Sequence, residues 1–239
     1  MDTNSLLIRI VLTLSLLFST PGLCRAWHDE THIAIAKASG YAKWYNAAGP
    51  DMAKLKAGDA EAHNHFVNNP AKTTVTPEMI LSQVRKYNRT DAYGHLYGAI
   101  IASLREYFNA KSEGKYESYH LAYLAHYIGD LSQPLHNTMY SLYNYENHTK
   151  TDGIINNDVL EHIGKIRLYP ITVSSEQDIA KEVARIANLS IALAKKIESE
   201  KRLLTQEEAY AQIGHSASLF KAILQYVKTV KPSKQGQWF

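Results

Sequence analysis

Cysteine is nearly absent from this 239-residue chain, and its single cysteine, Cys24, lies close to the N-terminus. No disulfide can therefore stabilise residues 27–239, and bound metal is one substitute. No Lys/Arg-rich run or basic tail indicates nucleic-acid binding by charge alone, since the formal net charge is only +3. Internal repeats, low-complexity stretches and β-type alternation are also lacking, and the apolar spacing is mostly helical.

The first 26 residues have the pattern of a secretory signal peptide. A short basic flank ending at Arg9 precedes an apolar run over 10–19. That run is too short to span a bilayer, because a spanning helix needs about 20 apolar residues. Cys24 and Ala26 supply the small residues that a signal peptidase recognises. We expect cleavage after Ala26, one mature domain over 27–239, and a secreted or periplasmic location, with an uncleaved anchor as the alternative.

The apolar periodicity predicts an all-α, single-domain helical bundle. Pro77 at a first-turn position and a capping box from Thr205 to Glu208 mark two helix starts. Polar, Asn- and Tyr-rich loops are expected over 64–76 and 137–157, and loops of that length suggest a functional site. Helices are expected over 31–45, 77–87, 93–110, 117–131, 178–201 and 205–230.

The eleven residues from His126 to His136, HYIGDLSQPLH, concentrate potential metal ligands. Positions i and i+4 of a helix share one face, so His126 and Asp130 can bind the same cation. Pro134 ends the helix and directs His136 to a different point. An isolated His-x3-Asp pair is often an ordinary ion pair, whereas the complete string favours a site for more than one metal ion.

This string resembles the His-Asp-Gln-Pro-His motif of the trinuclear zinc phosphodiesterases, the superfamily of zinc-dependent phospholipase C and the S1/P1 nucleases. Members of that family begin with a tryptophan whose amino group and carbonyl bind zinc. Cleavage after Ala26 would place Trp27 at that terminus, so the export signal and the motif indicate the same residue. The resemblance spans Trp27 to Asp152, and the C-terminal helices are expected to be scaffold.

The resemblance implies a cleft with three zinc ions and nine ligands, framed by the long loops. Asp130 would bridge two of the ions. Its partners come from the N-terminus and from the segments Gly-Pro-Asp and Asn-His-Phe. The implied ligands are Trp27 and His32 for one zinc, Asp51, His65, His126 and Asp130 for the next, and His136, His148 and Asp152 for the third.

Several of these positions have alternatives. Asp59 also lies upstream of His65, but the Gly-Pro-Asp context and the longer interval favour Asp51. His63 neighbours His65 and fits the family element less well. The general base would be Asp51, from its place in the family motif, or Glu30, from its closeness to the N-terminus. Three residues could replace His148 or Asp152 as ligands: Glu146, Asp158 and His162.

Clustered zinc ions activate water and neutralise phosphoryl charge, so hydrolysis needs no nucleophilic side chain. The interval from Trp27 to His32 and an aspartate at Asp152 are similar to the nuclease branch. The compact length and the segment 49–52 are similar to phospholipase C. We expect phospholipase C-type cleavage of phospholipid head groups by a monomer, with transient membrane contact. An S1/P1-type single-strand-specific endonuclease and 3′-nucleotidase is the alternative, and an exported zinc protein without turnover is a third hypothesis.

Overall fold

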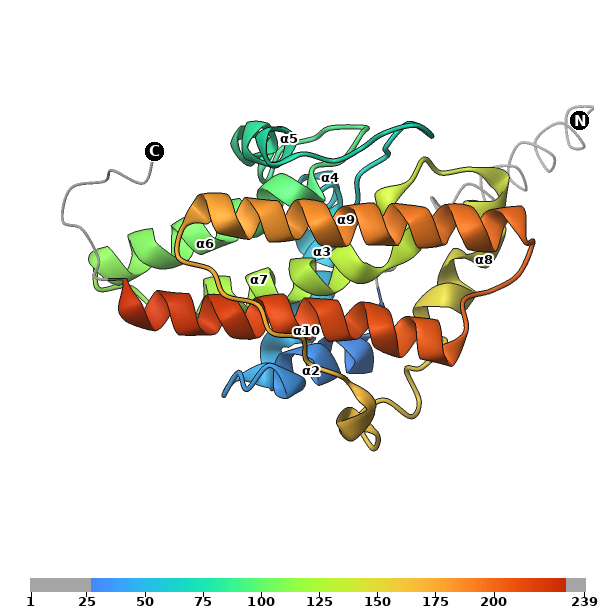
Figure 1. Cartoon of the computed structure of the whole chain (residues 1–239). Coiled ribbons are helices and arrows are strands. Elements are labelled where there is room, and N and C mark those ends of the chain that lie inside the picture. Colours follow the sequence, from blue (N-terminus) through green and yellow to red (C-terminus); the bar gives the residue numbers. More distant parts are fainter. Residues whose placement is uncertain (1–26, 231–239) are drawn as a thin grey trace, which may run out of the picture.

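The computed structural model describes residues 27–230, and the predicted signal peptide, 1–26, lies outside that part. The described chain contains nine α-helices and no strand, which confirms the predicted all-α class. None of its helices has the length and hydropathy needed to cross a membrane. The helices, shown in Figure 1, are α2 (Asp29–Ala38), α3 (Gly49–Ala57), α4 (Asp59–Ala62), α5 (Pro77–Gln83), α6 (Leu96–Ser112), α7 (Ser118–Ser132), α8 (Leu142–Asp152), α9 (Glu176–Ser199) and α10 (Gln206–Thr229).

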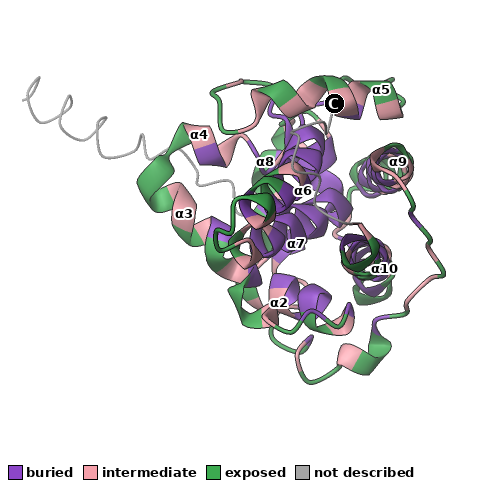
Figure 2. Cartoon of the chain, turned by 90° about the vertical axis from the view of Figure 1, so that its left-hand side faces the viewer, coloured by how far each residue is buried: buried purple, intermediate pink, exposed green. Residues whose placement is uncertain are grey.

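Helices α6 and α7 form the centre of the molecule, and α2, α3, α5, α9 and α10 pack around them (Figure 2). Every residue of α7 from Leu121 to Ser132 is buried. That segment is therefore apolar on nearly all sides, apart from the few polar side chains that face the candidate site. Such all-round apolarity is typical of a core helix, since a surface helix has only one apolar stripe.

The long helices α9 and α10 run side by side along one side of the bundle (Figures 1 and 2). Their starts follow from side-chain capping. Ser175 accepts a hydrogen bond from the Asp178 backbone, and Thr205 forms the predicted capping box with Glu208. Gln212 of α10 donates to the Ser132 carbonyl, so the scaffold helix also contacts the end of α7.

The secondary structure predicted for two segments is wrong. The helix predicted over 31–45 ends at Ala38, because the chain turns at Gly40 with φ +82°, a conformation that favours glycine. The loop predicted over 137–157 contains α8, which the Ser141 side chain caps. Helices α3 and α4 also lie in a region without a predicted helix. The loop over 64–76 is free of helix, as predicted.

Candidate metal centre

The candidate site forms where α7 meets the N-terminal helices and α8. His126 and Asp130 stand one turn apart on α7, with 3.4 Å between His126 Nε2 and Asp130 Oδ2. Gln133 then ends the helix and caps the next turn by accepting hydrogen bonds from the backbone N–H groups of Leu135 and His136. That turn, Pro134–Asn137, directs Nε2 of His136 toward His148 of α8.

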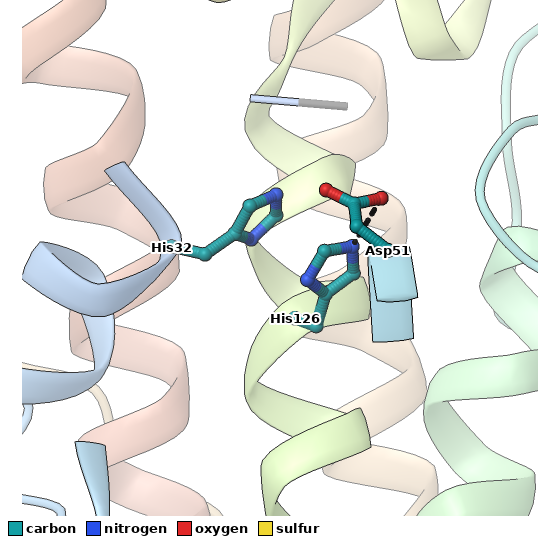
Figure 3. Close-up of side chains that lie close together, drawn as sticks. All are labelled: His32, Asp51 and His126. Atoms are coloured by element: carbon teal, nitrogen blue, oxygen red, sulfur yellow. Dashed lines mark ion pairs between the residues drawn. The ribbon is translucent and has the colours of Figure 1, made fainter. Parts of the chain in front are cut away.

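Five of the predicted ligands meet in a five-residue cluster: His32, Asp51, His65, His126 and Asp130. His32 of α2, Asp51 of α3 and His126 of α7 offer ligand atoms within 4.8 Å of one another. Figure 3 shows these three side chains converging from their separate helices, with Asp51 Oδ1 3.5 Å from His126 Nε2. His65, His126 and Asp130 form a second such group within the cluster.

Asp130 directs its two carboxylate oxygens to different partners. Oδ2 lies 2.8 Å from His65 Nδ1 and faces His126, while Oδ1 lies 3.3 Å from His32 Nε2. The side chain is fully buried. A carboxylate in this position can contact two cations at once, which is the arrangement that the family resemblance implies for Asp130.

His136, His148 and Asp152 form a separate three-residue cluster. Nε2 of His148 lies 3.0 Å from His136 Nε2 and 3.5 Å from Asp152 Oδ2. Gln133 donates a hydrogen bond to the other oxygen of Asp152. The predicted i, i+4 pair is therefore on one face of α8, and His136 reaches it from the turn after α7.

Both clusters have donor atoms that fit a metal ion. Ligand atoms about 2.0–2.1 Å from a tetrahedral zinc stand about 3.3 Å apart, close to the spacings found here. The opposite ring nitrogens are positioned to donate to protein oxygens: His126 Nδ1 to Ala47, His136 Nδ1 to His65 and His148 Nδ1 to Asn144. Such bonds orient ligating histidines. Buried atoms of His32, Asp130 and Asp152 have no hydrogen-bond partner among the described residues, although His32 Nε2 and Asp130 Oδ1 face each other at 3.3 Å. These groups could bind metal ions.

The electrostatics of the five-residue cluster favour charged carboxylates beside a neutral His32. Burial and the adjacent His126 lower the pKa of His32 to about 4, which leaves its ring neutral and able to ligate. Burial works against ionisation of Asp51 and Asp130, but the neighbouring cationic and hydrogen-bonding groups, His126 first among them, together outweigh it and hold the pKa of both carboxyls below the usual value. In the three-residue cluster, burial raises the pKa of Asp152 well above its usual value.

Trp27 and Glu30 lie at the start of the described chain, Trp27 before α2 and Glu30 in its first turn. The Trp27 ring is buried and its indole N–H donates to Ser132 Oγ at 3.3 Å. The next residue, His28, donates its backbone N–H to the Asp152 carbonyl, so the chain at Trp27 lies beside α8. Glu30 is half-buried on α2, and none of its described contacts joins it to either cluster.

The alternative ligands lie elsewhere. Asp59 is exposed at the start of α4, whereas Asp51 contacts His126. His63 Nδ1 accepts a hydrogen bond from the Asp91 backbone, outside the clusters. The three proposed substitutes for the second pair are exposed and absent from the described ligand groups: Glu146, Asp158 and His162.

Three charged residues near the clusters were not predicted from the sequence. Lys54 forms an ion pair with Asp51 one turn along α3. The pKa of Asp29 is raised by burial and then by the negative charge of Asp51. Glu61 is buried and lies 3.2 Å from His65 through Oε1 and Nε2. Glu61 lies four residues before His65, the same spacing as that between His126 and Asp130. This spacing is the one feature of the sequence from which a contact between Glu61 and a ligand could have been predicted.

Comparison with known proteins finds no matching family model, no matching curated protein and no matching solved structure.

Proposed function

We propose that this chain is an exported zinc-dependent phosphodiesterase that binds three zinc ions and hydrolyses phospholipid head groups by phospholipase C-type chemistry. The observation that supports it best is the convergence of eight side chains, drawn from four helices, the loop after α4 and the turn after α7, into the two clusters. Structural zinc sites are usually single and closed by four protein ligands. Adjoining groups that share His126, with Asp130 facing a histidine of each, fit that description poorly, and they favour a catalytic centre over a purely structural one.

Zinc bound here would lower the pKa of a coordinated water and neutralise charge on the phosphoryl group. The protein side chains would hold the ions and position the water. Asp51 suits the role of general base, because its side chain is 21% exposed and the other carboxylate of this cluster, Asp130, is fully buried. Glu30, the other candidate, has no described contact that supports the role. Lys54 beside Asp51 adds positive charge for an anionic substrate.

The exposed surface near the ligands supports a lipid substrate. Met52 and Leu55, on the helix that carries Asp51, are 65% and 70% exposed. Met139 and Leu142, just before and at the start of the helix that carries His148, are also exposed. Exposed apolar side chains of this kind can contact a membrane surface transiently. A single-strand-specific nuclease is the second candidate, because the exposed Tyr140 and Tyr145 offer stacking surfaces for bases.

The test is a metal count and an activity assay on one sample of protein beginning at Trp27. Zinc is counted by mass spectrometry, and the substrates are p-nitrophenylphosphorylcholine, mixed phospholipid vesicles and single-stranded DNA or RNA. The proposal expects about three zinc ions per chain and chelator-sensitive release of a phosphorylated head group. Release of nucleotides instead would assign the protein to the nuclease branch. Full zinc loading without turnover would favour the third hypothesis, a non-catalytic zinc protein.

A further inference from the structure

Glu61 is a buried carboxylate that the family motif does not include. It is 4% exposed and accepts hydrogen bonds from the Tyr127 hydroxyl at 2.7 Å and the Asn64 amide at 3.1 Å. Its third described partner is His65, with Nε2 3.2 Å from Oε1. Burial of a charged group is costly unless a compensating charge lies nearby. A cation bound on the far side of the His65 ring would supply that charge.

The two neutral donors to Glu61 are themselves fixed. The Asn64 side-chain oxygen accepts from the Asn88 backbone at 3.1 Å and lies 2.9 Å from His95 Nε2. Its amide nitrogen must therefore point toward Glu61, since oxygen and nitrogen cannot exchange places without losing these bonds. The Tyr127 ring is fully buried on α7. The carboxylate thus has a defined position relative to α7 and to the ring of His65.

His65 lies between Glu61 and the other ligands. Its Nδ1 is 2.8 Å from Asp130 Oδ2 and 3.2 Å from His126 Nε2, while its Nε2 faces Glu61. A neutral imidazole has one N–H donor and one acceptor nitrogen. With the proton on Nε2 and donated to Glu61, the lone pair of Nδ1 points at the space that His126 and Asp130 also face. His65 Nδ1, His126 Nε2 and Asp130 Oδ2 thus form a triangle around that space, and its third side, from His126 Nε2 to Asp130 Oδ2, is 3.4 Å.

We propose that Glu61 is a positioning residue of the metal centre, which accepts the Nε2 proton of His65 and directs Nδ1 at the ion shared with His126 and Asp130. The inference rests on the proposed function to the extent that the clusters must bind metal. Carboxylates that hold the second nitrogen of a ligating histidine also raise its basicity. Their loss typically weakens metal binding about 10- to 100-fold.

The experiment measures zinc affinity and cobalt spectra of the full mature chain and its variants. Glu61→Gln keeps the size of the side chain but removes its charge, and Glu61→Ala removes the contact. Zinc affinity is measured by competition with a chromophoric chelator. The visible absorption of the cobalt(II)-substituted protein reports the geometry of the ion itself. We expect Glu61→Gln to lower the affinity for one zinc ion about 10- to 100-fold and to shift the cobalt absorption bands, with a larger effect in Glu61→Ala.

Glu176→Gln is the matched control. Glu176 also loses a charged hydrogen-bonding partner on substitution, because Arg105 donates to it at 2.8 and 2.7 Å, but its described contacts lie outside the clusters. The zinc affinity and the cobalt spectrum of the Glu176→Gln protein should equal those of the wild type. Tyr127→Phe keeps the carboxylate and removes one of its donors. It should shift both readouts in the same direction by less than Glu61→Gln does.

Wild-type zinc affinity together with an unchanged cobalt spectrum in Glu61→Gln would overturn the positioning role, even if the wild-type enzyme hydrolyses phosphodiesters. A wild-type protein that binds no zinc would overturn this role and the proposed function together. If Glu61→Ala does not fold, Glu61→Gln and Tyr127→Phe decide the question. Circular dichroism of each variant verifies that the helical fold is retained.

Discussion

Asp130 connects the two ligand groups of the five-residue cluster, because its Oδ1 faces His32 and its Oδ2 faces His65. Asp130→Asn should therefore lose about two metal ions per chain, whereas Asp51→Asn should lose at most about one. Metal content after gel filtration, measured by mass spectrometry, checks this. Asp59→Asn is the control, since Asp59 is exposed and should keep the wild-type metal content. Equal losses in Asp130→Asn and Asp51→Asn would argue against a bridging carboxylate.

The residues that the sequence could predict are those whose roles follow from local spacing. His126 and Asp130 share a helix face by their i, i+4 relation, and Pro134 accounts for the separate direction of His136. Glu61 and Lys54 also contact ligands at local spacings, since Glu61 lies four residues before His65 and Lys54 three residues after Asp51. Charged neighbours at such spacings are common on helices, and Glu61 becomes distinct only in the folded structure, where it is buried and accepts a hydrogen bond from Tyr127 of α7.

At the scale of the element, capping signals located helices better than composition did. The start of α10 was predicted from Thr205 and Glu208, a local motif that forms as expected. Helix α8 was predicted as a loop, because its polar sequence lacks a clear apolar stripe. Its inward face consists instead of candidate ligands, His148 and Asp152, together with Asn144 and Thr151. Polar residues selected for a site thus obscure the periodicity from which helices are predicted.

The connection between α9 and α10 contains a pH-sensitive ion pair. Arg202 donates to both carboxylate oxygens of Glu208, at 2.7 and 2.8 Å, and lowers the pKa of Glu208 from 4.5 to about 2. Because the folded-state pKa is depressed, this pair stabilises the fold fully above pH 4.5. Its contribution is lost as the pH falls from 4.5 toward about 2.

Glu208→Gln should consequently be less stable than the wild type at pH 7, by up to about 1 kcal/mol, since the pair is close to the surface. The difference should shrink progressively below pH 4.5. Urea unfolding of both chelator-treated proteins between pH 7 and pH 3 measures it. Lys181→Gln, which removes an exposed pair with Asp178 on α9, controls for the general effect of surface charge. A difference that stays constant over this range would mean that the carboxylate of Glu208 contributes no stability through ionisation.

At the scale of the whole molecule, the described helices surround a set of buried acids and unpartnered polar atoms. Asp130, Asp152 and Glu61 are each less than 5% exposed. Asp51 has the Lys54 ammonium, but the described hydrogen-bond and ion-pair partners of the other three are histidine, tyrosine, glutamine and asparagine side chains. The metal-free chain carries this electrostatic cost within its core. Metal binding should therefore stabilise the entire fold, because α2 and α3 pack against α7, and α8 contacts the turn after α7 through Asn144 and His148.

Removal of metal should lower the melting temperature, and zinc should restore it in a concentration-dependent manner. Each site contributes about 4 kcal/mol when free zinc is 1,000 times its dissociation constant. In a domain of about 200 residues that energy corresponds to a shift of roughly 8–16 °C. Calorimetry of chelator-treated protein with added zinc measures the shift, and magnesium is the control, because it prefers oxygen ligands and the clusters are rich in histidine. Equal melting temperatures with zinc and with magnesium would contradict a histidine-based zinc centre. A large shift caused by zinc alone would support it independently of the substrate.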